Sequence, residues 1–488
     1  MGDVDRGIGD IQYRLAKPMK YFILLAILCL IPGCRTTLDT SSPHLIAINP
    51  DGKLYRHGDS EDYTGSQHFS NILRNIEVQR TNGITNILFF VQGGLNDLEH
   101  GIQRAETLSD AILTNEHRPA YPIFIAWDAS FTATYADHLY RVRRGRADRY
   151  GKFTAPFYLL GDVGRMIFRA PVSLSLQAQS DLKAGFMLKT QYSTNAGHEG
   201  WYWINPSIKD ANEAAERVLK TRPDLHLFLG GDQEDFSVKA ANGVSYFLTL
   251  PFKLLLTPVI DTAGKNAWDK MYRRTETMFT TPHTFNRAAL AHFLLQLKNY
   301  CDEHPEMRVT LVGHSMGTIV CNEIVRQDFG LPISAIVYMA AACGIDDWAN
   351  SVVPLLEENP QVNFYNLMLH PINDARETHY EMAWDAPPRG SLLEWIDNYY
   401  SASETDFGRT LGKWENSIMV LSGDVIPREI DQQLHVRAFD MGDVKTAGPQ
   451  KHGGMDDHPF WDPAFWKTPD ESVRAMEAQR KLPPALAK

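Results

Sequence analysis

The stretch Val309-Thr310-Leu311-Val312-Gly313-His314-Ser315-Met316-Gly317 decides the fold of this chain. It begins as a continuous apolar run, which is typical of a strand that is covered on both faces of a sheet. It ends in Gly-x-Ser-x-Gly, and residues 318–327 then show a helix-like pattern. A serine on a tight strand-to-helix turn has strained backbone angles and little space around it, so glycine flanks it on both sides. In this context the motif predicts that Ser315 is a nucleophile rather than a capping serine in a glycine-rich turn.

Further apolar runs predict the other strands of the sheet. They lie at 45–48, 87–91, 123–127, 335–340, 362–369, 418–421 and 435–439. Helical periodicity falls between several of them, as in Leu290, Phe293, Leu294 and Leu297. Strands that alternate with helices predict an α/β fold in which helices flank a mostly parallel central sheet.

The interval 129–283 breaks this alternation. It is far longer than a loop in a compact domain, so we expect a large, mainly helical insertion, or cap, on an α/β domain formed by 35–128 and 284–488. The insertion has apolar stretches at 157–160 and 246–256, and an arginine run at Arg141, Arg143, Arg144, Arg146 and Arg149. Such a cap can cover an apolar substrate or touch a bilayer surface. A cap with its own core and a solvated arginine face is the alternative interpretation.

The composition of the 488 residues excludes several classes of protein. Hydrophobic residues at 44% and charged residues at 22% are ordinary globular values. The net charge of −11 repels a phosphate backbone, so we expect no nucleic-acid partner. Beyond residue 34 the cysteines are Cys301, Cys321 and Cys343, and no Cys or His cluster has zinc-ligand spacing. We therefore expect neither a disulfide framework nor a structural metal.

Residues 1–34 have the features of an export signal. From Met19 a lysine is followed by an apolar run at 22–31 and by Pro32-Gly33-Cys34. The run is too short for a bilayer, which needs about 20 residues. Leu30-Ile31-Pro32-Gly33-Cys34 resembles a bacterial lipobox, which implies that Cys34 is the lipidated N-terminus of an envelope lipoprotein. An uncleaved hydrophobic anchor is the alternative, and it too places the rest of the chain outside the cytoplasm.

The serine motif, together with the earlier loop Gln92-Gly93-Gly94-Leu95 after a strand, resembles the α/β-hydrolase superfamily of serine esterases and lipases. The resemblance covers residues 84–128 and the chain from 284 onward. It implies the chain order nucleophile, acid, histidine, with no cofactor. It also implies an oxyanion hole of backbone N–H groups, from Met316 and from Gly94 or Leu95. Many members have His-Gly where this chain has Gln92-Gly93.

A base must take the proton of the serine hydroxyl, because a neutral hydroxyl is a poor nucleophile. In the superfamily this histidine follows the last strand, which here is 435–439. His452, followed by two glycines, is the predicted base, and His458 on the same loop is the reserve. The other downstream histidines are His370, His379 and His435.

The third member of the triad is a carboxylate that orients the imidazole. Asp374 fits this place because it closely follows the strand predicted at 362–369. Asp424, in a Ser-Gly-Asp turn, is the competitor, and Asp346 is the third choice. Each of them can instead be an ordinary capping residue.

Together these features predict an exported, lipid-anchored serine hydrolase that cleaves carboxylic esters through an acyl-enzyme. The apolar insertion and the membrane tether favour acyl esters of lipids as substrates. Peptidases and thioesterases use the same residues, so they remain open. A non-catalytic, envelope-associated binding protein on the same fold is the alternative, because the acid is open and the oxyanion loop lacks its usual histidine.

Overall fold

The computed structural model describes residues 40–55, 66–116, 118–143, 146–186, 208–231, 236–280, 288–377, 388–401, 403, 405–423, 425–441 and 448–467. The leader with Cys34, and also His379 and Asp424, lie outside the described residues. The predictions that concern them therefore stay predictions.

The described part of the chain contains one eight-stranded sheet in which every ladder is parallel, with the order β1-β3-β2-β5-β6-β7-β8-β4. The strands are β1 (Leu45–Ile48), β2 (Asn86–Val91), β3 (Tyr121–Trp127), β4 (His226–Leu229), β5 (Arg308–His314), β6 (Ile333–Met339), β7 (Asn363–Met368) and β8 (Leu434–Ala438). All residues of β2 and β3 are buried, as expected of strands covered on both faces. The predicted α/β class with a mostly parallel sheet is confirmed.

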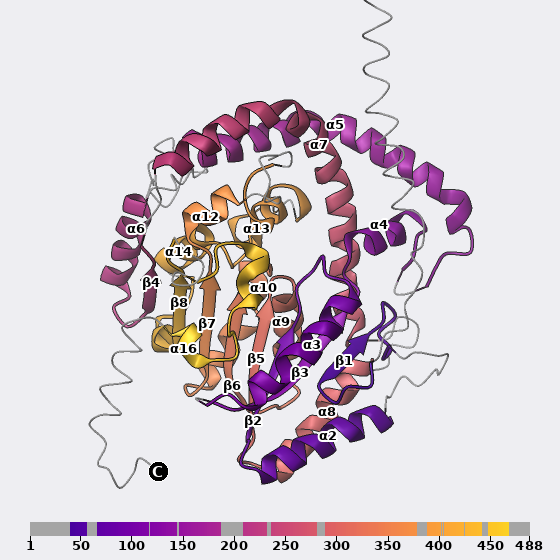
Figure 1. Cartoon of the computed structure of the whole chain (residues 1–488), viewed down its shortest axis with the longest axis vertical. Coiled ribbons are helices and arrows are strands. Elements are labelled where there is room, and N and C mark those ends of the chain that lie inside the picture. Colours follow the sequence, from indigo (N-terminus) through magenta and orange to yellow (C-terminus); the bar gives the residue numbers. More distant parts are fainter. Residues whose placement is uncertain are drawn as a thin grey trace, which may run out of the picture.

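Helices cover the sheet and lie around it (Figure 1). α3 packs on β3, and α9 packs on β5. The α-helices are α2 (Ser66–Thr81), α3 (Leu98–Leu113), α4 (Phe131–Leu139), α5 (Gly151–Phe186), α6 (Ile208–Thr221), α7 (Phe236–Thr277), α8 (Ala289–Glu303), α9 (Gly317–Arg326), α10 (Ile345–Ala349), α11 (Val352–Glu358), α12 (Pro371–Arg376), α13 (Leu392–Trp395), α14 (Trp414–Ser422) and α16 (Pro463–Trp466).

One strand prediction is wrong. Residues 418–421 belong to α14 instead. Trp414, Ile418 and Leu421 are all buried and lie at helical three-and-four spacing, so they form one apolar face. A four-residue apolar run does not by itself distinguish a strand from a buried helix.

The interval 129–283 is mainly helical, as expected, but part of it belongs to the sheet. Its longest helices, α5 and α7, run side by side and curve around the rest of the molecule (Figure 1). Between them, β4 pairs with β8 in the register His226 to His435. This pairing covers the outer side of β8, so β4 from the insertion is the last strand of the sheet at this end.

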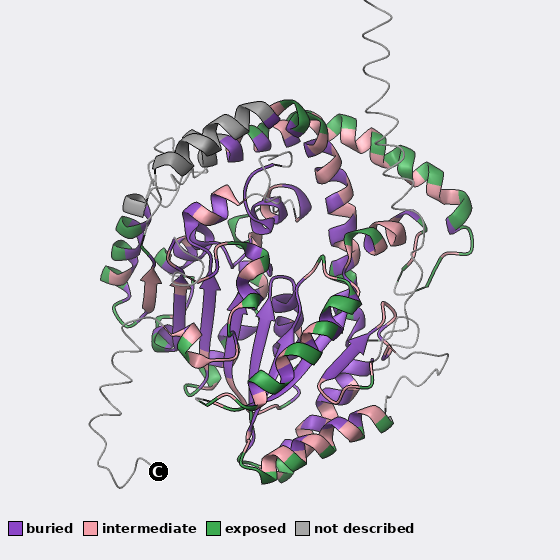
Figure 2. Ribbon diagram, viewed as in Figure 1, coloured by how far each residue is buried: buried purple, intermediate pink, exposed green. Residues whose placement is uncertain are grey.

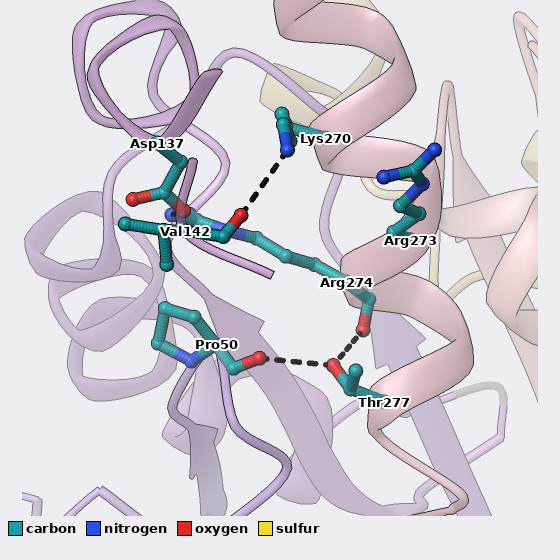
Figure 3. A pocket seen from close by; sticks show the side chains of 7 residues that line it. All are labelled: Pro50, Asp137, Val142, Lys270, Arg273, Arg274 and Thr277. Carbon is teal, nitrogen blue, oxygen red and sulfur yellow. Dashed lines mark hydrogen bonds and ion pairs between the residues drawn. The ribbon is translucent and has the colours of Figure 1, made fainter. Parts of the chain in front are cut away.

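The last turns of α7 make polar contacts around a small cavity, with the segment 137–142 of the insertion and with Pro50 of the α/β domain (Figure 3). Lys270 Nζ donates to the Val142 carbonyl at 3.1 Å, and Thr277 Oγ1 donates to the Pro50 carbonyl at 3.1 Å. Arg274 Nη2 donates to Asp137 at 2.6 Å. The cavity is lined by Pro50, Asp137, Val142, Lys270, Arg273, Arg274 and Thr277. This lining contains none of the predicted site residues, so the cavity is an anchoring point for α7.

Candidate active site

The candidate site lies where the strand order reverses. β2 lies between β3 and β5 in the sheet. From β2 the chain continues to β3 on one side, whereas from β5 it continues to β6 on the other side. The register pairs Val91 with Gly313, so the loop after β2 starts beside the end of β5. In open α/β sheets, ligands bind at the carboxyl ends of strands at such a switch point. This topology brings the loop at 92–95 to Ser315.

Ser315 occupies a strained turn between β5 and α9. Its φ is +50°, in the left-handed region that costs a non-glycine residue about 1–2 kcal/mol. Its N–H donates to the Met339 carbonyl at 2.9 Å. A Cβ on Gly317 would lie 2.2 Å from the Val91 carbonyl oxygen, and one on Gly313 would lie 3.0 Å from the Thr318 backbone. Both glycines of the motif are therefore explained by close backbone packing.

The structure brings Ser315 and His452 together. His452 begins the 3-10 helix η4 (His452–Asp457) on the segment after β8. Its Nε2 lies 2.9 Å from Ser315 Oγ, and the two residues are only 5% and 1% exposed. An imidazole at hydrogen-bond distance from a serine hydroxyl can take its proton and activate it as a nucleophile.

The other candidate bases within the described residues make structural contacts away from Ser315. His458 stacks on Phe465 with ring centroids 5.6 Å apart. His370 accepts from the Ile372 N–H at the start of α12. His435, within β8, stacks on His226 and on Tyr365.

The backbone hydrogen bonds of the loop after β2 distinguish Gly94 from Leu95 as the oxyanion donor that acts with Met316. The Leu95 N–H donates to the Ala129 carbonyl at 3.0 Å, so it is already engaged. Among the described residues, no backbone acceptor is found for the N–H groups of Gly94 and Met316. A Cβ on Gly94 would lie 3.2 Å from Met316 Cβ, so these residues are in close contact. The geometry therefore favours Gly94 over Leu95 as the partner of Met316.

Gln92 stabilises this loop where many α/β hydrolases have histidine. Its Nε2 donates to the Trp127 carbonyl at 2.6 Å, and Trp127 Nε1 donates to the Gln92 carbonyl at 3.4 Å. Gln92 is also buried. These two bonds tie the ends of β2 and β3 together, so a histidine is not required for that purpose.

Asp374 lies in a buried charged cluster. It is on α12 and has a side-chain hydrogen bond with Ser391. Burial raises the pKa of the Asp374 carboxyl, and the nearby Lys413 ammonium opposes this rise. Glu415 and Glu394 add negative charge around it. The contacts of Asp374 are with this cluster and not with His452. Asp346, the third choice, is exposed at the start of α10 and accepts from the Asp347 N–H.

Among the described residues, the carboxylate of Glu377 contacts His452, and the sequence analysis missed it. Its Oε2 accepts from the backbone N–H of His452 at 2.9 Å. Burial raises the pKa of Glu377 to about 8, although the His452 hydrogen bond opposes the rise. The residue follows α12 directly, three positions after Asp374, and the sequence analysis considered only aspartates in this region. Because Glu377 binds the His452 backbone, it fixes the position of the histidine rather than the tautomer of its ring.

A second contact binds the backbone carbonyl of His452. His314 Nε2 lies 3.1 Å from the His452 carbonyl oxygen, to which it can donate. His314 Nδ1 lies 3.4 Å from Asp456 Oδ2, and Arg104 on α3 forms an ion pair with the same carboxylate. Burial tends to raise the pKa of Asp456, but His314 and Arg104 outweigh it and lower that pKa well below its usual range. His314 thus links the turn that carries Ser315 to the loop that carries His452.

Within the described ranges, no three His, Cys, Asp or Glu side chains are grouped so as to hold a metal ion. Cys301, Cys321 and Cys343 are buried free thiols. Burial raises the pKa of the Cys301 thiol to about 12, so this thiol is poorly suited to nucleophilic chemistry.

Comparison of the chain with protein-family models, with curated proteins and with solved structures gives no match. A functional assignment therefore has to be argued from the geometry of the site.

Proposed function

We propose that this chain is a serine hydrolase of the α/β-hydrolase type, which cleaves carboxylic esters through an acyl-enzyme intermediate. The observation that carries the proposal is the 2.9 Å contact between Ser315 Oγ and His452 Nε2 on a strained strand-to-helix turn. The topology supports it, because the serine follows the central strand β5 and the histidine follows β8. This is the chain order of α/β-hydrolase triads.

In the first half of the reaction, Ser315 Oγ attacks the ester carbonyl carbon while His452 Nε2 takes the hydroxyl proton. The negative charge that develops on the carbonyl oxygen is stabilised by the N–H groups of Met316 and Gly94. His452 then gives the proton to the leaving alcohol, and the acyl group stays on Ser315. In the second half, His452 deprotonates a water molecule, which attacks the acyl carbon, and it then returns the proton to Ser315 Oγ as the carboxylic acid leaves.

Lipid acyl esters are the proposed substrate class. Ser315 is almost fully buried, so an ester bond can reach its hydroxyl only inside the protein, away from bulk water. The leader adds a separate argument, because a lipid on Cys34 would keep the enzyme at the cell envelope, where acyl lipids are found. Thioesters and peptides are the alternative substrates for the same residues.

A fluorophosphonate probe tests the proposal directly, because it reacts only with an activated serine. We expect the purified chain to be labelled at Ser315 and to hydrolyse members of a panel of acyl esters, with peptides and thioesters run in parallel. Absence of both labelling and turnover would favour the non-catalytic binding protein instead.

Substitutions of Glu377 and Asp374 test whether a carboxylate acts by positioning His452 or through its negative charge. Glu377→Ala should lower kcat by about 10- to 100-fold, because it removes the acceptor of the His452 N–H and lets the imidazole move. Glu377→Gln should keep most of the rate, because its amide oxygen can accept the same bond. Asp374→Asn should also keep most of the rate, because Asp374 contacts the Lys413 cluster instead of His452.

Steady-state kinetics on the three variants check this order. A strong loss in Glu377→Gln would make its charge, and not only its bond to the backbone, essential. A strong loss in Asp374→Asn would restore Asp374 as the triad acid.

His314 gives a second prediction, as a positioning residue. His314→Ala should lower kcat by about 10- to 100-fold with little change in KM, because the loop of His452 loses one of its hydrogen bonds while substrate binding is untouched. His314→Gln keeps an N–H donor and should recover part of the loss. Equal kcat values for His314→Ala and the unsubstituted chain would show that the contact does not position His452.

A further inference from the structure

The outward face of α5 is apolar. Five of its large apolar residues are between 65% and 87% exposed: Phe153, Phe157, Leu160, Ile167 and Phe168. At 3.6 residues per turn, these five positions fall within about 100° of one another around the axis, so they lie on one side of the helix. Figure 2 shows exposed residues in green along the outer side of this helix, away from the sheet. We call these five residues the α5 stripe.

The opposite face of α5, which packs on α7, is polar. Lys253 and Asp181 form an ion pair at 3.2 Å and are both fully buried. Farther along the two helices, Asn266 Nδ2 donates to Asp162 Oδ1 at 2.8 Å, and Thr257 Oγ1 donates to Gln177 Oε1 at 2.9 Å. Arg169 pairs with the buried Asp261 at 3.2 Å.

The polarity of α5 is therefore the reverse of that in an ordinary surface helix, which buries its apolar side and hydrates its polar side. Large contiguous apolar patches on a protein surface mark sites of interaction with another molecule or with a membrane. Because polar contacts already hold the inner face, the stripe is free to face an apolar environment.

Charge around the stripe identifies the partner. Between residues 141 and 175 the acidic residues are Asp148 and Asp162. Asp148 pairs with Arg141 at 3.6 Å, and Asp162 faces inward, where it accepts from Tyr135 at 2.8 Å. The exposed charged side chains near the start of the stripe are basic: Arg143, Arg146, Arg149 and Lys152. The chain as a whole has a net charge of −11, so this is a local reversal of sign.

We propose that the α5 stripe is a docking surface for an anionic lipid bilayer, in which α5 lies in the interfacial plane. Basic residues beside a long apolar face are the features of interfacial helices, whose cations bind lipid phosphates while the apolar side enters the acyl boundary. Within the described residues no helix is long and apolar enough to cross a membrane. The inference does not depend on the proposed hydrolase activity.

The helix that carries the α5 stripe is linked to the candidate site through its contacts with α7. α7 packs along α5, and Met271 of α7 lies close to Gly94 in the loop that we assign to the oxyanion hole. A bilayer that binds the outer face of α5 would therefore contact a helix that packs on α7, and α7 reaches this loop.

Vesicle co-sedimentation of the full chain tests the proposal. The chain carries Cys34→Ser and Ser315→Ala, so that neither lipidation nor hydrolysis contributes. We expect it to bind vesicles of phosphatidylglycerol and phosphatidylcholine more tightly than vesicles of phosphatidylcholine alone. Phe157→Glu/Phe168→Glu should weaken binding at least about tenfold, since it removes two large apolar groups and adds two negative charges. Both side chains are exposed, so the fold loses no core contact.

Two further variants complete the test. Val78→Glu changes an exposed apolar residue on α2 and should leave binding unchanged. Arg146→Glu/Arg149→Glu should weaken binding to the anionic vesicles and reduce its salt dependence. Hydrogen exchange should show new protection of α5 on the vesicles.

Three results would overturn the proposal. The first is equal vesicle binding by Phe157→Glu/Phe168→Glu and its parent, which would assign binding to another part of the chain. The second is absence of binding to either vesicle. The third is a dimer in analytical ultracentrifugation that the α5 variant dissociates while vesicle binding is unchanged, which would assign the stripe to a second copy of the chain.

Discussion

Ser315→Ala should abolish ester turnover and fluorophosphonate labelling, with a loss in kcat on the order of a millionfold. The physical reason is that the hydroxyl of Ser315 is the group that becomes bonded to the acyl carbon. It is also the group that His452 Nε2 contacts at 2.9 Å. Without it, only the oxyanion N–H groups and substrate binding can accelerate hydrolysis.

The folded state should survive this substitution. The side chain loses one hydroxyl in a buried position, and the backbone bonds of Ser315 to Met339 and Ala342 do not involve that group. Thermal unfolding of the variant checks this point. Ser334→Ala on the neighbouring strand β6 is the matched control, and it should be labelled and active like the unsubstituted chain. Turnover by Ser315→Ala near the unsubstituted level would remove the nucleophile from the proposal.

His452→Ala should be as inactive as Ser315→Ala, because the serine then has no base within reach. His458→Ala is the matched control on the same segment. His458 stacks on Phe465, so its loss should leave most of the rate. The measurement is kcat and kcat/KM on the best substrate of the ester panel.

The two losses should not multiply. Residues that act as one unit are strongly non-additive, so Ser315→Ala/His452→Ala should be no slower than either single variant. If the double variant were slower than both by the product of their effects, the two residues would be acting independently. A fast His452→Ala together with a slow His458→Ala would transfer the role of base to His458.

Much of the sheet could be predicted from the sequence. The runs at 87–91, 123–127 and 309–312 lie in the central strands β2, β3 and β5, because strands buried on both faces need unbroken apolar sequence. The tight turn at Ser315 could be predicted from the sequence as well. Its glycines at 313 and 317 are required by backbone contacts within that turn and with β2, and such requirements appear in the residues themselves.

Other features could not be predicted, because they depend on which elements meet. The run at 418–421 has a helical apolar face only when Trp414 is counted with it. The pairing of β4 with β8 joins segments from opposite sides of α7 in the chain. The role of Glu377 depends on where α12 ends relative to His452, which no local pattern encodes.

The sequence by itself determined the α/β class, the central strands and the residues Ser315 and His452 as candidates. Hydrophobic periodicity and the positions of glycines depend on residues that are close together in the sequence, so both can be recognised without the tertiary structure. The tertiary structure decided the rest. It placed an imidazole 137 residues away in the chain at hydrogen-bond distance from the serine, and it engaged the Leu95 amide. It also turned the apolar side of α5 outward. These outcomes depend on how helices pack over the sheet, so the contacts form only when the whole domain has folded.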